Sequence, residues 1–137
     1  MAYIGGGSYR PSASPVKSRP SNDLSKYQLA GGGYVNIDKA GLSNWSAIVV
    51  TVNITYGSTA TAGVRVRCLY SQDGASYDSP QDADAQGNYY DPFFSAGSTV
   101  QSTIVFPILT GNLRIQIYNK DPSNAHTINN VWTTLMA

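Results

Sequence analysis

The chain of 137 residues is long enough for one domain and too short for two independent hydrophobic cores. Only 12% of its residues are charged and glutamate is absent, whereas Tyr, Thr, Val and Ile are frequent, so the composition favours strands over helices. The formal net charge of +1 gives no basis for binding nucleic acid or a membrane through overall charge, and neither is predicted as a partner.

The first 33 residues differ from the rest in composition. Glycine triplets at 5–7 and 31–33 enclose three prolines and several serines, a mixture that buries too little apolar surface to offset the entropy lost on ordering. We predict a flexible, basic arm over residues 1–33, which is either a disordered tail or a segment that becomes ordered against a neighbouring subunit. In the second case the predicted interface residues of the arm are Tyr3, Ile4, Tyr9, Arg10, Lys17, Arg19 and Tyr27.

From residue 34 onward apolar and polar residues alternate with the period of two that is typical of strands. A first clear strand covers about 48–56, and its predicted inward residues are Ile48, Val50, Val52, Ile54 and Tyr56. Turn residues at 57–63 separate it from a second strand, whose predicted inward residues are Val64, Val66, Cys68 and Tyr70. Arg65 and Arg67 are then expected to point outward.

Further strands follow in the last third of the chain. Residues 100–108 predict a strand limited by Pro107, which lacks an N–H group and therefore belongs at a sheet edge or a bend. Turn signals at 111–112 and 121–124 flank a strand over 113–117, and a last strand runs from about 127 to 135. Short strands between Gly, Pro, Asn and Asp turns predict an all-β, antiparallel, jelly-roll-like β-sandwich over residues 34–137.

The segment 71–97 is too long for a hairpin turn, and insertions of this length are often functional. Its run 82–87 resembles the start of a calcium loop, but Phe93 occupies the place of the closing glutamate, so calcium binding stays open. Its aromatic side chains suit a protein interface, a contact with the core or a sugar-binding surface. The predicted interface residues of this segment are Tyr77, Tyr89, Tyr90, Phe93 and Phe94.

Catalytic chemistry has little support in the sequence. His126 is the only histidine, it is expected to be solvated at a turn, and no GxSxG elbow presents a nucleophile. Cys68 is the only cysteine, which excludes an internal disulfide, and one His with one Cys is too few for a zinc site. We therefore predict a non-enzymatic protein with no catalytic residues, no metal and no cofactor.

The chain begins without the apolar segment of a signal peptide, and no apolar run approaches the roughly 18 residues needed to span a bilayer. These features predict a soluble protein that is made in a cytoplasm.

Three segments carry a resemblance to a known group of proteins: 1–5 (MAYIG), 69–78 (LYSQDGASYD) and 113–121 (LRIQIYNKD). The first resembles the starts of some tailed-bacteriophage virion proteins, and the other two resemble β-sandwich modules of phage head, neck and tail accessory proteins. The resemblance implies a structural virion protein, either a capsid decoration protein or a head–tail or tail accessory. It would dock through its sandwich and its arm, with other virion proteins and its own copies as partners. The alternative is a carbohydrate- or receptor-binding module of a tail fibre.

Overall fold

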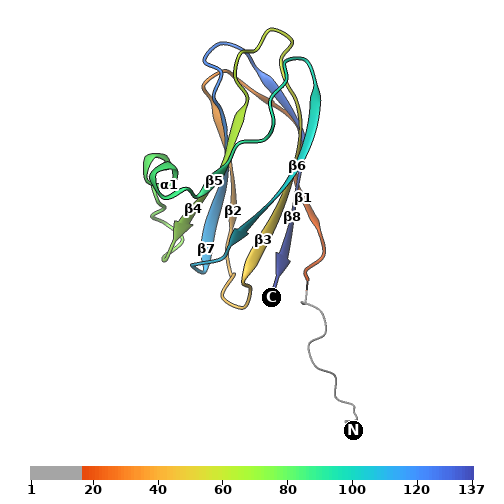
Figure 1. Ribbon diagram of the computed structural model, residues 1–137. Helices are drawn as coiled ribbons and strands as arrows, with labels where there is room; N and C mark the ends of the chain where they lie inside the picture. The colour runs from red at the N-terminus through yellow and green to blue at the C-terminus, as the bar shows by residue number, and fades with distance from the viewer. Residues whose placement is uncertain (1–16) are drawn as a thin grey trace.

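The computed structural model describes residues 17–137, which form two antiparallel four-stranded sheets packed face to face (Figure 1). The first sheet has the order β1-β8-β3-β6, with bounds Ser21–Leu29, His126–Met136, Ala47–Thr55 and Thr99–Pro107. The second has the order β2-β7-β4-β5, with bounds Tyr34–Lys39, Asn112–Asn119, Val64–Ser71 and Tyr89–Tyr90. The predicted antiparallel β-sandwich is confirmed.

The core lies between the two sheets and follows the alternation of the sequence. The four predicted inward residues of β3 are buried, and so is Tyr56, which directly follows the strand. The four predicted inward residues of β4 are buried as well. β7 contributes Leu113, Ile115 and Ile117, which have no exposed surface. Burial of this size stabilises the fold by roughly 25 cal/mol for each Å² of apolar surface removed from water.

The strand β1 corrects the predicted arm. Ser21–Leu29 pairs with β8, and Leu29 is buried in the core, so the first sheet begins well before the boundary expected at residue 33. The strand is hard to see in the sequence because it lies at a sheet edge, where most of its side chains are exposed and polar. Its register with β8 also shifts between Asn22 and Leu24, which interrupts the alternation.

β6 confirms the expected position of Pro107. The strand forms an edge of the first sheet, and Pro107 is its last residue.

The long insert between β4 and β6 contains one short helix, α1, over Pro80–Gln86. Ser79 caps its first turn by accepting the Asp82 N–H (3.1 Å), and Pro80 follows directly. Gly87 ends it with a φ of 76°, a conformation that favours glycine. Seven residues give no recognisable helical stripe. Within residues 17–137 there is no helix long and apolar enough to cross a membrane.

Candidate functional site

The outer face of the second sheet carries aligned rows of aromatic and polar side chains. Antiparallel register places Tyr34 of β2 beside Tyr118 of β7, and Asn36 beside Gln116. Arg67 of β4 extends the second row across the sheet. Because side chains alternate along a strand, these five leave the sheet on the side away from the core.

The insert forms a wall over this face. Its first turn is fixed by Asp73, whose Oδ1 accepts the N–H groups of Ala75 (2.9 Å) and Ser76 (2.8 Å). Between wall and sheet lies a cleft of about 620 Å³. The side chains that line it include Tyr34, Asn36, Tyr77, Asp78, Arg114, Gln116 and Tyr118. A second hollow of about 520 Å³ lies on the other side of the insert, and its one aromatic ring belongs to the buried Tyr70.

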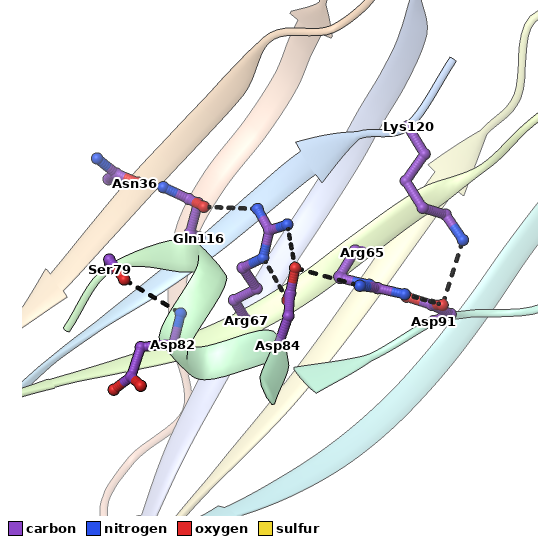
Figure 2. Close-up of polar contacts among 9 residues, drawn as sticks. All are labelled: Asn36, Arg65, Arg67, Ser79, Asp82, Asp84, Asp91, Gln116 and Lys120. Carbon is purple, nitrogen blue, oxygen red and sulfur yellow. Dashed lines mark hydrogen bonds and ion pairs between the residues drawn. The ribbon is translucent and has the colours of Figure 1, made fainter. Parts of the chain in front are cut away.

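A chain of hydrogen bonds ties the insert to the floor of the cleft (Figure 2). Arg67 donates to both carboxylate oxygens of Asp84 on α1, each at 2.8 Å. Its Nη1 donates to Gln116 Oε1 (3.0 Å), and Gln116 Nε2 donates to Asn36 Oδ1 (3.2 Å). These bonds hold the amides of Gln116 and Asn36 in one orientation. The Asn36 side chain is exposed, and its amide nitrogen lies at the end of this series of hydrogen bonds.

Two further arginines bind carboxylates in the same bidentate way. Arg65 donates to both carboxylate oxygens of Asp91 (2.9 and 3.0 Å), and Asp91 also accepts a hydrogen bond from Lys120 Nζ (3.2 Å). Arg114 donates to Asp38 (2.7 and 3.0 Å).

Each arginine also lies over a tyrosine ring. Arg65 lies 3.9 Å from the centre of the Tyr89 ring, and Arg67 lies 4.8 Å from that of Tyr118. Arg114 lies 4.1 Å from the centre of the Tyr77 ring, so the wall of the cleft packs on its floor.

These contacts keep the carboxylates ionised. Hydrogen bonds from Arg114, Arg67 and Arg65 lower the pKa values of Asp38, Asp84 and Asp91, respectively. A glycosidase acid needs a raised pKa, so none of these three carboxyl groups is suited to donate a proton near neutral pH.

The lowered pKa values predict loss of stability in acid. In the unfolded chain these carboxyl groups titrate near pH 4, and in the folded chain they titrate lower, so the unfolded state binds more protons as the pH falls. We expect the melting temperature to be nearly constant from about pH 7 to about pH 5 and to fall below about pH 4. Circular dichroism melts across this range measure it. Asp84→Ala should flatten the acid limb, and an acid limb that is absent in the native chain would contradict the prediction.

Of the predicted interface residues of the arm, the structure describes Lys17, Arg19 and Tyr27. Tyr3, Ile4, Tyr9 and Arg10 lie outside the described residues. Lys17 is exposed and pairs with Met136 in an isolated bridge. Arg19 is exposed just before β1, and Tyr27 lies on β1 itself.

The predicted aromatic residues of the insert take four different positions. Tyr77 lines the cleft, and Tyr89 packs under Arg65. Tyr90 and Phe93 are exposed at 45% and 71%. Phe94 packs against the core, with its ring centre 5.0 Å from that of Tyr56.

The calcium-like run forms α1 instead of a metal loop. Asp84 points toward the arginines, whereas Asp82 points away from them in Figure 2 and accepts from the Gln86 side chain (2.8 Å). Among the described residues, His, Cys and Asp side chains form no group of three that is suited to a metal.

The solvated histidine that we expected is instead buried. His126 Nδ1 accepts the Gly57 N–H (3.0 Å), which places the proton on Nε2, and this donates to the Ala62 carbonyl (2.9 Å). The side chain joins the loops at one end of the sandwich. Cys68 is buried as expected, and burial raises the pKa of its thiol to about 12.

Most of the cleft was missed by sequence reasoning. Tyr34, Asn36, Gln116 and Tyr118 belong to β2 and β7, and their outward positions follow from the same period of two that identified the core. The missing signal was the pairing of β2 with β7, which brings residues about 80 positions apart into one row, as in the Gln116–Asn36 hydrogen bond.

Comparisons with known proteins find no matching family model and no matching curated protein. Among solved structures, a family 35 carbohydrate-binding module from Clostridium thermocellum has a TM-score of 0.48 at 16% identity, covering 87% of this chain and 90% of that one. A family 16 carbohydrate-binding module has a TM-score of 0.47 at 13% identity, covering 78% and 74%. Dimeric latent PorU from Porphyromonas gingivalis has a TM-score of 0.47 at 14% identity, covering 85% of this chain and 11% of that one. At these TM-scores the similarities assign no function to the chain.

Proposed function

We propose that the chain is a non-catalytic binding module that holds a neutral carbohydrate in the cleft between the second sheet and the insert. The observation that carries the proposal is the exposed Tyr34 ring beside a row of oriented amides. Tyr34 is 59% exposed and lies next to Tyr118 in the register of β2 and β7.

The side chains of the cleft suit the two kinds of surface that a sugar ring presents. An exposed tyrosine ring packs on the apolar C–H face of a pyranose, and amides donate to and accept from its hydroxyl groups. The exposed Asn36 accepts from the buried Gln116, which is itself held by Arg67, so Asn36 is already oriented and little side-chain entropy is lost on binding. The cleft volume of about 620 Å³ lies within the range of roughly 300–1,000 Å³ that is usual for small-ligand sites.

The charges of the cleft favour a neutral ligand. Arg67 is compensated by Asp84, and Arg114 is compensated by Asp38, both through bidentate contacts. An acidic sugar would have to compete with these carboxylates for the arginines. A neutral hexose polymer requires no such exchange.

The ionisable side chains in and near the cleft favour binding of a ligand without catalysis. The arginine-bound carboxylates stay ionised, and His126 is buried in a separate loop cluster with both ring nitrogens engaged. The cleft therefore offers a platform for binding, and we propose no reaction for it.

Affinity electrophoresis in gels that contain neutral soluble polysaccharides tests the proposal, followed by calorimetry with the oligosaccharide of any retarding polymer. We expect retardation by at least one neutral polymer and a loss of affinity of about tenfold or more for Tyr34→Ala. Tyr90→Ala is the matched control, because Tyr90 is also exposed but does not line the cleft. Equal affinities of the Tyr34→Ala and native proteins, or no retardation in any gel, would overturn the proposal.

Docking on a phage particle is a second candidate, which the resemblance suggests and which the exposed Phe93 favours, since a 71% exposed ring suits a protein contact. A module of a tail fibre would have both functions, because it would be attached to the phage particle and would bind a glycan on the surface of the host cell. Mass spectrometry of purified particles tests this placement, and Phe93→Ala should reduce incorporation while leaving glycan binding unchanged.

A further inference from the structure

The four edges of the two sheets are protected to very different degrees. Exposed edges invite pairing with another chain, and proteins usually block them with charges, bulges or short strands. β1 carries a register shift after Asn22 and the exposed Lys26, which has a φ of 52°. β2 carries Asp38 and Lys39, and β5 is only two residues long.

β6 has none of these features along most of its length. Its nine residues, TVQSTIVFP, include no charged side chain, and it pairs with β3 without a register shift. It forms the margin of the first sheet opposite β1 (Figure 1). Pro107 closes the strand at one end, and its carbonyl accepts the Tyr70 hydroxyl (2.6 Å).

The hydrogen bonds that flank β6 show which of its backbone groups face away from β3. The Tyr56 N–H donates to Ser98 O (3.0 Å), and the Ile108 N–H donates to Ser46 O (2.8 Å). Because bonding alternates along an antiparallel pair, the even-numbered residues of β6 bond to β3. The N–H and C=O groups of Thr99, Gln101, Thr103 and Val105 therefore point to the free edge, and no residue within 17–137 hydrogen-bonds to them there.

The side chains of these four residues are exposed, and three of them are already held by β3. Thr103 Oγ1 bonds Thr51 Oγ1 (2.9 Å), and Thr99 Oγ1 bonds Thr55 Oγ1 (2.7 Å). Gln101 accepts from the Asn53 amide (3.2 Å). Val105 is 59% exposed. Little side-chain freedom remains to be lost if a strand adds to this edge.

We infer that a second copy of the chain pairs with this edge, β6 against β6 in antiparallel orientation around a two-fold axis. A register centred on Ser102 places Thr99 opposite Val105 of the other copy, and Gln101 opposite Thr103. Each such pair exchanges two backbone bonds, so all the free groups are satisfied by about eight inter-chain bonds. The match is self-complementary, as a two-fold contact requires, and the net charge of +1 gives little repulsion between copies.

Sedimentation of the full chain tests the inference. We expect a dimer at micromolar concentration, and Gln101→Lys with Thr103→Lys should give a monomer, because the register places the two lysines opposite each other. Mixing this double variant with Gln101→Glu and Thr103→Glu should restore a dimer made of one copy of each. A native chain that is monomeric, or a double lysine variant that dimerises as the native chain does, would overturn the inference.

A control variant distinguishes the edge from the flat outer face of the same sheet. Trp132 is exposed on β8, which is separated from β6 by β3. Trp132→Lys should leave the dimer intact. If this variant is monomeric while the double lysine variant of β6 still dimerises, the copies associate through the outer face of the first sheet, which would contradict the inference.

Disulfide trapping tests the register. Ser102→Cys should cross-link under mild oxidation, because residues opposite each other in a non-hydrogen-bonded pair lie about 4.5 Å apart between Cα atoms. Thr99→Cys should not, because the two copies of residue 99 lie roughly 20 Å apart in this register. The buried Cys68, whose thiol pKa is raised to about 12, should not compete. Faster cross-linking of Thr99→Cys would contradict the register.

Discussion

A chain shortened to residues 34–137 is expected to be unfolded at room temperature, whereas a chain of residues 17–137, which keeps β1, should fold and melt cooperatively. The reason is that β1 completes the first sheet. Its removal takes Leu29 from the core and exposes the long strand β8, which loses its partner over Ser21–Leu29.

The expected loss of stability is comparable to the whole stability of a domain of this size. Replacing a buried leucine with alanine alone costs about 2–5 kcal/mol, and typical domains are stable by only about 5–15 kcal/mol. The deletion removes Leu29 completely, and with it the backbone pairing of β1 and the 2.8 Å ion pair of Asp23 with Lys39. These losses together approach the whole stability of the domain.

The chain of residues 17–137 is the matched control, because it keeps the contacts that precede β1. The Ser18 N–H donates to Leu135 O (2.9 Å), and the Leu135 N–H donates to Ser18 Oγ (2.8 Å). Circular dichroism melts and proton NMR spectra of both shortened chains measure the result. A cooperative melt of the 34–137 chain close to that of the full protein would show that β1 contributes little to folding.

The strands that a single sequence reveals are those whose alternation is driven by the core. In β3 apolar residues alternate and burial alternates with them, and in β4 and β7 the alternating apolar residues are also buried, although some of their outward neighbours are covered as well. The edge strand β6 was also foreseen, because Pro107 restricts a strand in a way that needs no knowledge of its neighbours.

The features that sequence reasoning missed depend on contacts between distant residues. β1 is a strand because β8 lies beside it, although its own composition resembles a linker. Arg67 points outward from the core as predicted, but the sequence gives no sign that the insert covers it and that α1 supplies its partner. His126 is buried because the loops at Gly57 and Ala62 close around it.

The candidate site shows the same division. The aromatic residues of the insert drew attention to the correct wall, but only Tyr77 of the five faces the cleft. The floor is formed by β2 and β7, and their outward residues become neighbours only when the order of strands in the sheet is known. The alternation of apolar and polar residues predicts on which side of the sheet a side chain lies. The order of the strands is needed to predict which other side chains lie next to it.

The bond between Arg67 and Asp84 is therefore expected to matter for both stability and binding, since it joins the wall of the cleft to its floor (Figure 2). Asp38 with Arg114 offers a matched comparison, because it has the same bidentate geometry on the neighbouring strand, but Asp38 is 49% exposed. Water compensates an exposed charge that loses its partner, and it does so poorly for a buried one.

Arg67→Ala should lower the free energy of unfolding by about 2 kcal/mol, because it removes both hydrogen bonds to the part-buried Asp84, which keeps only Arg65 as a partner (3.3 Å), and leaves the buried Gln116 Oε1 without its donor. Asp38→Ala should cost less than about 1 kcal/mol, as exposed ion pairs usually do. In a double-mutant cycle, Arg67→Ala with Asp84→Ala should cost clearly less than the sum of the two single changes, since the partners act as one unit. Urea titrations of the four chains measure the cycle. Additive costs, or equal costs for Arg67→Ala and Asp38→Ala, would show that the insert is held by its other contacts, chiefly Ala83 and Tyr77, and not by this ion pair.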